Sequence, residues 1–149
     1  MVSFLIAYAS WSGNTEEVAE IVEETLLSEG MQVMVHRIGI GPMPNPRQFD
    51  AMIIGSFTWD KGSTPDEVKD FVVDVGYKPR NVYVFGTGDT QFGGDDLFCG
   101  AAVKLARFYG STYKPLKIEQ SPRGTQENKV IEWSKGVFQH WRHLHALKY

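Results

Sequence analysis

Residues 2–27 read VSFLIAYASWSGNTEEVAEIVEETLL, and this stretch decides the fold class. It begins with a continuous apolar run, Val2–Ala9, which predicts a strand buried on both faces. A short polar loop follows, and from Thr15 to Leu27 apolar residues recur at helical spacing while glutamates fill the other positions. A buried strand that leads directly into an amphipathic helix is typical of a parallel sheet covered by helices.

The same alternation of strand and helix patterns continues to the end of the chain. Further strands are predicted at 31–38, near an edge of the sheet, and at 51–56, 81–86 and 116–119, and further helices at 64–75, 97–109 and 126–144. Gly39–Pro46 holds two Gly and three Pro, which excludes a long helix there. We therefore predict an α/β fold, a doubly wound five-stranded parallel sheet with helices on both faces, in one domain spanning residues 1–149.

Composition excludes several classes of function. The chain of 149 residues has a net charge of −3 and no basic footprint, which argues against nucleic acid as a partner. Its single Cys excludes an intrachain disulfide framework and any CxxC metal site. No apolar run approaches the roughly 20 residues that span a bilayer. The N-terminal stretch lacks the basic segment of a signal peptide. We expect a soluble, cytoplasmic protein.

The basic end of the chain has two interpretations. After Glu132 the charged residues are Lys135, Arg142 and Lys148, accompanied by His140, His143 and His145. We expect a solvated final helix whose cations complement the negative end of its dipole. A metal-binding tail is the less favoured alternative, because this spacing of histidines lacks carboxylate or Cys partners.

Ligands of open parallel sheets bind outside the carboxyl ends of the strands, which points to the loops at 10–15, 57–64 and 87–96. The first loop, Ser10-Trp11-Ser12-Gly13-Asn14-Thr15, places three hydroxyls and an amide at a helix N-terminus and contains no Lys or Arg. This pattern predicts a phosphate site built from neutral donors. The nucleotide-binding patterns GxxxxGK and GxGxxG are both absent. An ordinary helix cap with a Gly turn is the alternative.

The other two loops carry aromatic side chains among small and polar residues. Trp59 stands between Thr58 and Asp60, and Phe92 precedes two glycines. One interpretation is that Trp59 folds back onto the core. The favoured interpretation is that the two aromatic side chains and the phosphate site together form a slot for a planar ring that bears a phosphate.

With these residues in place, the chain resembles the flavodoxins, and the resemblance runs over nearly its whole length. The family motif Ser/Thr-x-Thr/Ser-Gly-Asn-Thr is matched by Ser10–Thr15, and its Thr-Trp/Tyr loop by Thr58-Trp59. Its Gly-x-Gly-Asp and Phe-Cys-Gly-Ala-Val stretches are matched by Gly86–Asp89 and Phe98–Val103. The fifth strand follows its helix without a long insertion, as in short-chain flavodoxins. The resemblance implies the strand order 2-1-3-4-5.

The resemblance also implies tight, non-covalent binding of FMN. Ser10, Ser12 and the run Gly13–Thr15 would hold the phosphate, while Trp59 and Phe92 would cover the two faces of the ring. The backbone around Thr58–Asp60 and Thr87–Asp89 would meet the ring edges. Cys99 is interpreted as a small core residue rather than a redox group. The full set of expected cofactor-binding residues is Ser10, Trp11, Ser12, Gly13, Asn14, Thr15, Ser56, Phe57, Thr58, Trp59, Asp60, Gly62, Thr87, Gly88, Asp89, Phe92, Phe98 and Cys99.

Three features depart from the family pattern. Asp60 stands where the family commonly has Gly after the stacking aromatic. The loop that contains Phe92 is longer than usual. The region around Pro42–Pro46 lacks a normal second helix.

Function is then expected from the family. The first hypothesis is a monomeric, low-potential one-electron carrier, not an enzyme, that takes electrons from a flavodoxin/ferredoxin–NADP reductase and passes them to oxidising redox proteins. Acidic residues near the ring would steer basic partners: Asp60, Asp66, Glu67, Asp89, Asp95 and Asp96. The alternative is a flavodoxin-like activator of manganese-dependent ribonucleotide reductase, suggested by Arg123–Glu127. A flavin- or quinone-reducing enzyme is the least favoured.

Overall fold

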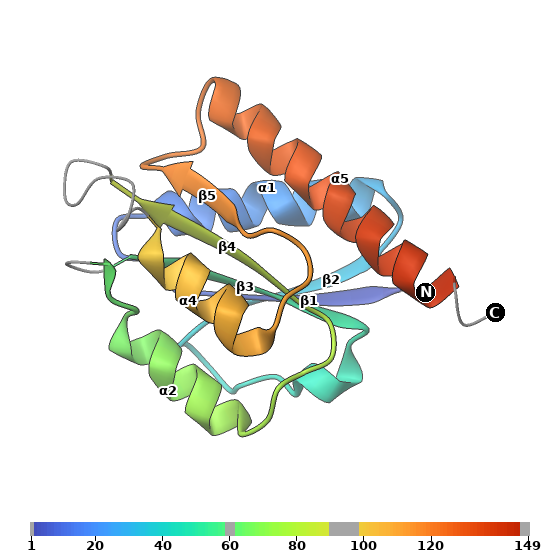
Figure 1. The fold of residues 1–149 in the computed structure, drawn as a ribbon, viewed down its shortest axis with the longest axis horizontal. Helices are drawn as coiled ribbons and strands as arrows, with labels where there is room; N and C mark the ends of the chain where they lie inside the picture. The colour runs from blue at the N-terminus through green and yellow to red at the C-terminus, as the bar shows by residue number, and fades with distance from the viewer. Residues whose placement is uncertain (1, 59–61, 90–98, 147–149) are drawn as a thin grey trace.

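A computed structural model of the chain describes residues 2–58, 62–89 and 99–146. Five parallel strands form one twisted sheet in the order β2-β1-β3-β4-β5, which confirms the predicted fold class and strand order (Figure 1). The strands are β1 (Ser3–Tyr8), β2 (Gln32–Arg37), β3 (Ala51–Phe57), β4 (Val82–Gly88) and β5 (Leu116–Glu119). β2 occupies an edge of the sheet, as predicted.

Helices cover both faces of the sheet. They are α1 (Asn14–Ser28), α2 (Asp66–Val75), α4 (Gly100–Tyr109) and α5 (Thr125–Ala146), and a short 3-10 turn, η1 (Pro46–Gln48), precedes β3. α1 and α5 pack on one face, and α2 and α4 pack on the other. None of the helices in the described residues combines the length and hydrophobicity that crossing a bilayer requires.

The core lies on both sides of the central strands, because successive side chains of a strand point to opposite faces. In β1, Phe4 and Ile6 pack against α1 and α5, while Leu5 and Ala7 pack toward α2 and α4. All four of these side chains are fully buried. The continuous apolar run that predicted this strand is therefore the consequence of burial on both faces.

Two glycines allow unusually close packing within this core. A side-chain carbon on Gly55 of β3 would overlap the ring of Phe85 on the neighbouring strand β4. A side-chain carbon on Gly86 would lie 2.7 Å from the Cβ atom of Ala102, so α4 can rest directly on β4.

The predicted element boundaries need some correction. The helix expected from residue 97 begins only at Gly100, because Cys99 has a left-handed φ of 52°; Leu97 and Phe98 lie outside the described residues. The helix expected from residue 64 begins at Asp66, with Pro65 as its cap residue. The long connection between β2 and β3 holds only η1, as its Gly and Pro residues predicted.

The final helix differs from the expected solvated one at His140. Its Nδ1 lies 2.9 Å from the Tyr83 hydroxyl and its Nε2 lies 3.3 Å from the Thr112 hydroxyl. The ring also packs edge-on against Tyr83. Burial, and secondarily His143, lowers the pKa of His140. His140 thus belongs to the packing between α5 and the sheet.

Candidate functional site

The three loops selected from the sequence follow β1, β3 and β4, so they start from the same edge of the sheet, at the left of Figure 1. β1 has β2 on one side and β3 on the other, so the order of connection reverses between β1 and β3. A reversal of this kind opens a crevice at the carboxyl ends of the strands, where ligands of doubly wound sheets bind. The described parts of these loops therefore define the candidate site.

The first loop ends in a helix N-terminus that no side chain caps. Gly13 precedes α1 with a left-handed φ of 96°, and its own N–H donates to the Ser10 hydroxyl at 3.1 Å. The amides in the first turn of a helix lack partners within the helix and lie at the positive end of its dipole. Ser12 is exposed and Asn14 is half-buried beside them. This arrangement fits a bound phosphate group.

Two buried threonines join the first loop to the third. The Thr15 and Thr87 hydroxyl oxygens lie 2.8 Å apart, and both residues are almost fully buried. This bond connects the start of α1 to the carboxyl end of β4. Thr15, which the resemblance assigns to the phosphate, has a hydroxyl that is already engaged with Thr87.

We expect Thr15→Val to lower the free energy of unfolding by about 1–2 kcal/mol, because it leaves the Thr87 hydroxyl buried without its partner. Urea unfolding of the parent and of the variant measures the loss. Thr15→Val combined with Thr87→Val removes both hydroxyls, and its cost should be well below the sum of the two single losses. Additive losses would contradict the bond.

A cation that the sequence analysis missed contacts the first loop. Arg37, the last residue of β2, donates from Nη2 to the Ser10 carbonyl at 3.3 Å, and its Nη1 lies 3.7 Å from the Glu16 carboxylate. The same carboxylate accepts from the Tyr8 hydroxyl at 3.3 Å. Burial, and secondarily Glu16, raises the pKa of Tyr8. The loop contains no Lys or Arg, yet the predicted neutral site has a guanidinium beside it.

The second loop is held at both of its described ends. The Thr58 N–H donates to the Thr87 carbonyl at 3.1 Å, and the Thr58 hydroxyl accepts from the Ala101 N–H at 3.3 Å. Further along, a side-chain carbon on Gly100 would lie 2.8 Å from the Gly62 carbonyl oxygen. Gly62 itself has a left-handed φ of 80°. The backbone at Gly62 is therefore in close contact with the start of α4.

The third loop begins at Gly88 and Asp89, where the segment after β5 supports it. The Gln120 N–H donates to the Gly88 carbonyl at 2.7 Å, and the Gln120 side-chain amide donates to the Asp89 carboxylate at 3.1 Å. Gln120 has a left-handed φ of 56°, which brings both of its donors toward this loop. The sequence analysis did not include Gln120.

Cys99 lies beneath the loops rather than among their exposed groups. Its side chain is fully buried, and its thiol donates to the Ile118 carbonyl at 3.7 Å. Burial raises the pKa of the Cys99 thiol to about 12. The interpretation of Cys99 as a core residue is confirmed, so any cofactor contact here would involve its backbone.

The structure brings together most of the predicted site residues that it describes. The first loop, Thr58 and Thr87–Asp89 lie along one edge of the sheet. Ser56 is fully buried, and its hydroxyl donates to the Phe57 carbonyl. Trp11 is exposed over 73% of its surface. The predicted ring contacts Trp59, Asp60, Phe92 and Phe98 lie outside the described residues.

The chain is similar to known flavodoxins in both sequence and structure. The family model described as "Flavodoxin" matches residues 6–133. Probable flavodoxin 2 of Bacillus subtilis is 32% identical over 144 residues, which cover 91% of this chain and 93% of the relative. Oxidised flavodoxin 2 from Bacillus cereus superimposes with a TM-score of 0.78 at 30% identity, covering 93% of this chain and 99% of that one. A Fusobacterium nucleatum flavodoxin variant bound to flavin mononucleotide shares the fold with a TM-score of 0.76 at 14% identity, covering 94% of this chain and 97% of that one.

Proposed function

Because this chain belongs to the flavodoxin family, we propose that it binds one FMN non-covalently and carries electrons one at a time between redox proteins. The observation that carries this proposal is the uncapped N-terminus of α1 at the strand-order reversal between β1 and β3. Flavodoxins are themselves a standard example of the rule that places FMN at this reversal. A flavodoxin relative has been solved with flavin mononucleotide bound.

The phosphate of FMN would lie against the first turn of α1. Its backbone amides would donate to the phosphate oxygens, together with the accessible side chains of Ser12 and Asn14. Arg37 would act indirectly, since its guanidinium holds the Ser10 carbonyl and adds positive charge near the dianion. The ring would lie between the second and third loops, with Trp59 and Phe92 on its faces as the family resemblance implies.

Bound FMN would supply the electron transfer itself, and the chain would set the surroundings of the ring. The Thr58 N–H donates to the Thr87 carbonyl, so the start of the second loop is tied to β4. The buried Thr15–Thr87 bond joins the first loop to the carboxyl end of β4, near the place proposed for the ring.

The proposed partners are redox proteins that approach the loop edge. Asp66 and Glu67 are exposed in the first turn of α2, and Asp89 is half-buried at the end of β4. These carboxylates would attract basic patches on a flavodoxin/ferredoxin–NADP reductase and on oxidising acceptors. Asp60, Asp95 and Asp96 would add to this field and lie outside the described residues.

We propose a single-domain cytoplasmic monomer. Within the described residues, no feature favours the alternative of a ribonucleotide reductase activator over the carrier.

The proposal is tested on the purified protein by reconstitution with FMN. Stoichiometric uptake of one FMN, quenching of flavin fluorescence and reduction in two separable one-electron steps are the expected results. Steady-state oxidation of NAD(P)H by the protein alone would contradict the carrier function and support an enzyme. A protein that takes up no FMN would overturn the proposal.

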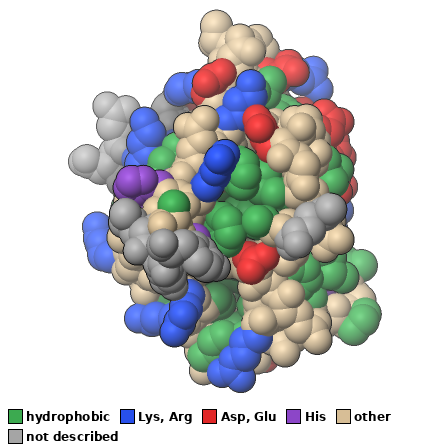
Figure 2. Space-filling view, turned by 90° about the vertical axis from the view of Figure 1, so that its right-hand side faces the viewer, with side chains coloured by type: hydrophobic (Ala, Val, Ile, Leu, Met, Phe, Trp, Pro, Cys, Tyr) green, Lys and Arg blue, Asp and Glu red, His purple; other side chains and the backbone are tan. Residues whose placement is uncertain are grey.

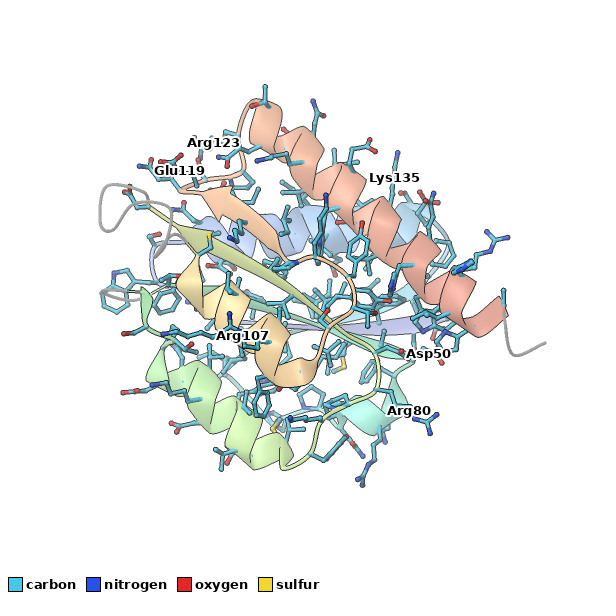
Figure 3. The ribbon with its side chains drawn as sticks, viewed as in Figure 1. Asp50, Arg80, Arg107, Glu119, Arg123 and Lys135 are labelled. Atoms are coloured by element: carbon cyan, nitrogen blue, oxygen red, sulfur yellow. The ribbon has the colours of Figure 1, made fainter. Side chains whose placement is uncertain are left out.

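Arg37→Met is expected to weaken FMN binding about tenfold, the lower end of the range for a charge-assisted hydrogen bond, because Arg37 is partly exposed. Fluorescence titration of the apoprotein measures the dissociation constant. Arg123→Met is the matched control, since Arg123, just before α5 in Figure 3, pairs with Glu17 of α1 at 3.4 Å rather than with the carbonyl of Ser10. Equal weakening in both variants would show that only the general loss of positive charge matters.

A further inference from the structure

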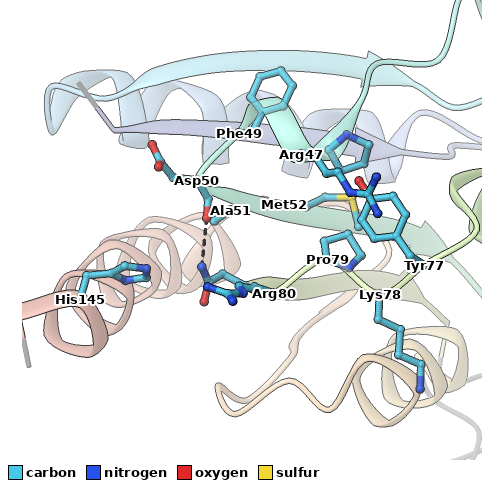
Figure 4. Close-up of a pocket in the computed structure, with 12 residues that line it drawn as sticks. Arg47, Phe49, Asp50, Ala51, Met52, Tyr77, Lys78, Pro79, Arg80 and His145 are labelled. Carbon is cyan, nitrogen blue, oxygen red and sulfur yellow. Dashed lines mark hydrogen bonds between the residues drawn. The ribbon is translucent and has the colours of Figure 1, made fainter. Parts of the chain in front are cut away.

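A second pocket lies at the opposite edge of the sheet, at the amino ends of β3 and β4 (Figure 4). Its volume is about 410 Å³, and it is open to solvent. Small-molecule sites have volumes of roughly 300–1,000 Å³. The whole length of the strands separates this pocket from the three loops that follow β1, β3 and β4, which we call the cofactor loops. A ligand bound here would leave the first site free.

The pocket exists because the connection from β2 to β3 contains no full helix. The short turn η1 forms one wall with Pro46 and Arg47, and the segment between α2 and β4 forms the other with Tyr77–Arg80. Ala51 and Met52, both buried, lie between them. The Asn81 side-chain amide donates to the Asp50 carbonyl at 3.0 Å and ties the two walls together, as the dashed line in Figure 4 marks.

Positive charge gathers around this pocket although the whole chain carries −3. Arg47, Lys78, Arg80 and His145 all line it. Among the described residues that line it, only Asp50 has a carboxylate, and this already accepts from the Ser3 N–H at 2.8 Å. Figure 2 views this side of the molecule and shows Lys and Arg side chains over much of it, its lower part included, whereas Asp and Glu gather mainly at the top, with one near the centre.

Aromatic rings orient two of these cations. The Arg47 guanidinium lies 4.1 Å from the centre of the Tyr77 ring, and the Lys78 ammonium lies 4.4 Å from the centre of the Phe108 ring. Aromatic faces orient a cation but leave its hydrogen-bond donors available. Across residues 2–58, 62–89 and 99–146, no carboxylate pairs with Arg47, Lys78 or Arg80.

We propose that this pocket binds a small organic phosphate that carries several negative charges. The phosphate groups would contact Arg47 and Arg80, because guanidinium groups bind phosphate oxygens in pairs. Lys78 would add positive charge at the rim, since its side chain extends toward α4 (Figure 4). The organic part would rest on Phe49, Met52 and Pro79, which supply the apolar portion of the lining. The cofactor loops already account for one FMN, so this site would be a second one, and it does not depend on the proposed electron transfer.

The test uses protein saturated with FMN, so that the cofactor site is filled. ATP, adenosine and inorganic tripolyphosphate are each titrated and followed by calorimetry and by the backbone amide spectrum in NMR. ATP is expected to bind and to shift the amides of Arg47–Met52 and Tyr77–Asn81 without changing flavin fluorescence. Adenosine should fail to bind, and tripolyphosphate should bind more weakly than ATP. Equal binding of tripolyphosphate would overturn the organic part of the proposal, and release of flavin by ATP would place binding in the cofactor loops.

Two variants make the assignment specific. Arg80→Glu is expected to weaken ATP binding at least about tenfold, because it removes a charge-assisted contact and adds a repulsive one. Lys135→Glu makes the same change of charge at an exposed position on α5 that does not line the pocket, and it should leave the affinity within about twofold (Figure 3). Equal losses in the two variants, or no ATP binding to the parent, would overturn the proposal.

Discussion

Replacing Gly55 by alanine is expected to lower the free energy of unfolding by about 3 kcal/mol, the upper part of the usual range for overpacking a core. The new methyl group would overlap the ring of Phe85. That ring is fully buried and packs edge-on against Trp133 of α5, with the ring centres 6.3 Å apart, so it has no open space to enter. Chemical unfolding followed by circular dichroism measures the loss.

A second substitution that removes the overlap distinguishes this cause from a general intolerance of β3 to substitution. Phe85→Leu alone should destabilise the protein, because it removes part of a filled core. In the Gly55→Ala background the same change should cost much less, since the smaller side chain makes room for the methyl group. Strictly additive losses would show that the two side chains do not compete for one space.

Replacing Gly100 by valine is expected to weaken FMN binding by roughly tenfold to a hundredfold, which corresponds to 1–3 kcal/mol of overpacking. A Cβ atom at this position would lie 2.8 Å from the Gly62 carbonyl oxygen and 3.1 Å from the Gly62 Cα atom. Backbone atoms cannot rotate away as the end of a side chain can, so the second loop must move. That loop leads from Thr58 to Gly62 and contains the expected stacking residue Trp59.

The control for this variant is Lys104→Val, because Lys104 is exposed on the same helix. It introduces the same β-branched side chain and its small cost in helix propensity without approaching Gly62. FMN titration of both apoproteins, with their unfolding midpoints measured in parallel, distinguishes loop displacement from loss of fold. Unchanged affinity in Gly100→Val would show that this close approach has no part in the cofactor site.

Much of the fold could be predicted because the central strands are buried on both faces. Residues 2–9 and 51–56 form unbroken apolar runs for that reason, and the structure has strands at Ser3–Tyr8 and Ala51–Phe57. The start of α4 was predicted too early, because the apolar sequence before Gly100 contains no Gly or Pro that would signal the left-handed turn at Cys99. Helical spacing alone could not show that His140 packs against Tyr83, which lies 57 residues away.

The sequence predicted those site residues that lie next to one another along the chain, within a single loop. Arg37 was missed because attention went to the loops after the first, third and fourth strands, whereas Arg37 lies at the end of the second. Parallel pairing places it directly beside Tyr8, just before the first loop. The expected strand order already placed the second strand beside the first, but only the register shows that Arg37 is the residue next to Tyr8. Gln120 was missed for a similar reason, because it reaches Asp89 only through the pairing of β4 with β5.

The buried bond between Thr15 and Thr87 has a consequence for how quickly the protein could take up its cofactor. The two hydroxyls join segments 72 residues apart in the chain, and the bond is made by protein atoms alone. The start of α1 and the carboxyl end of β4 are thus already joined, and binding loses little conformational entropy in bringing these two segments together. Association need not wait for them to meet, so this part of the site should add no slow conformational phase to the binding kinetics.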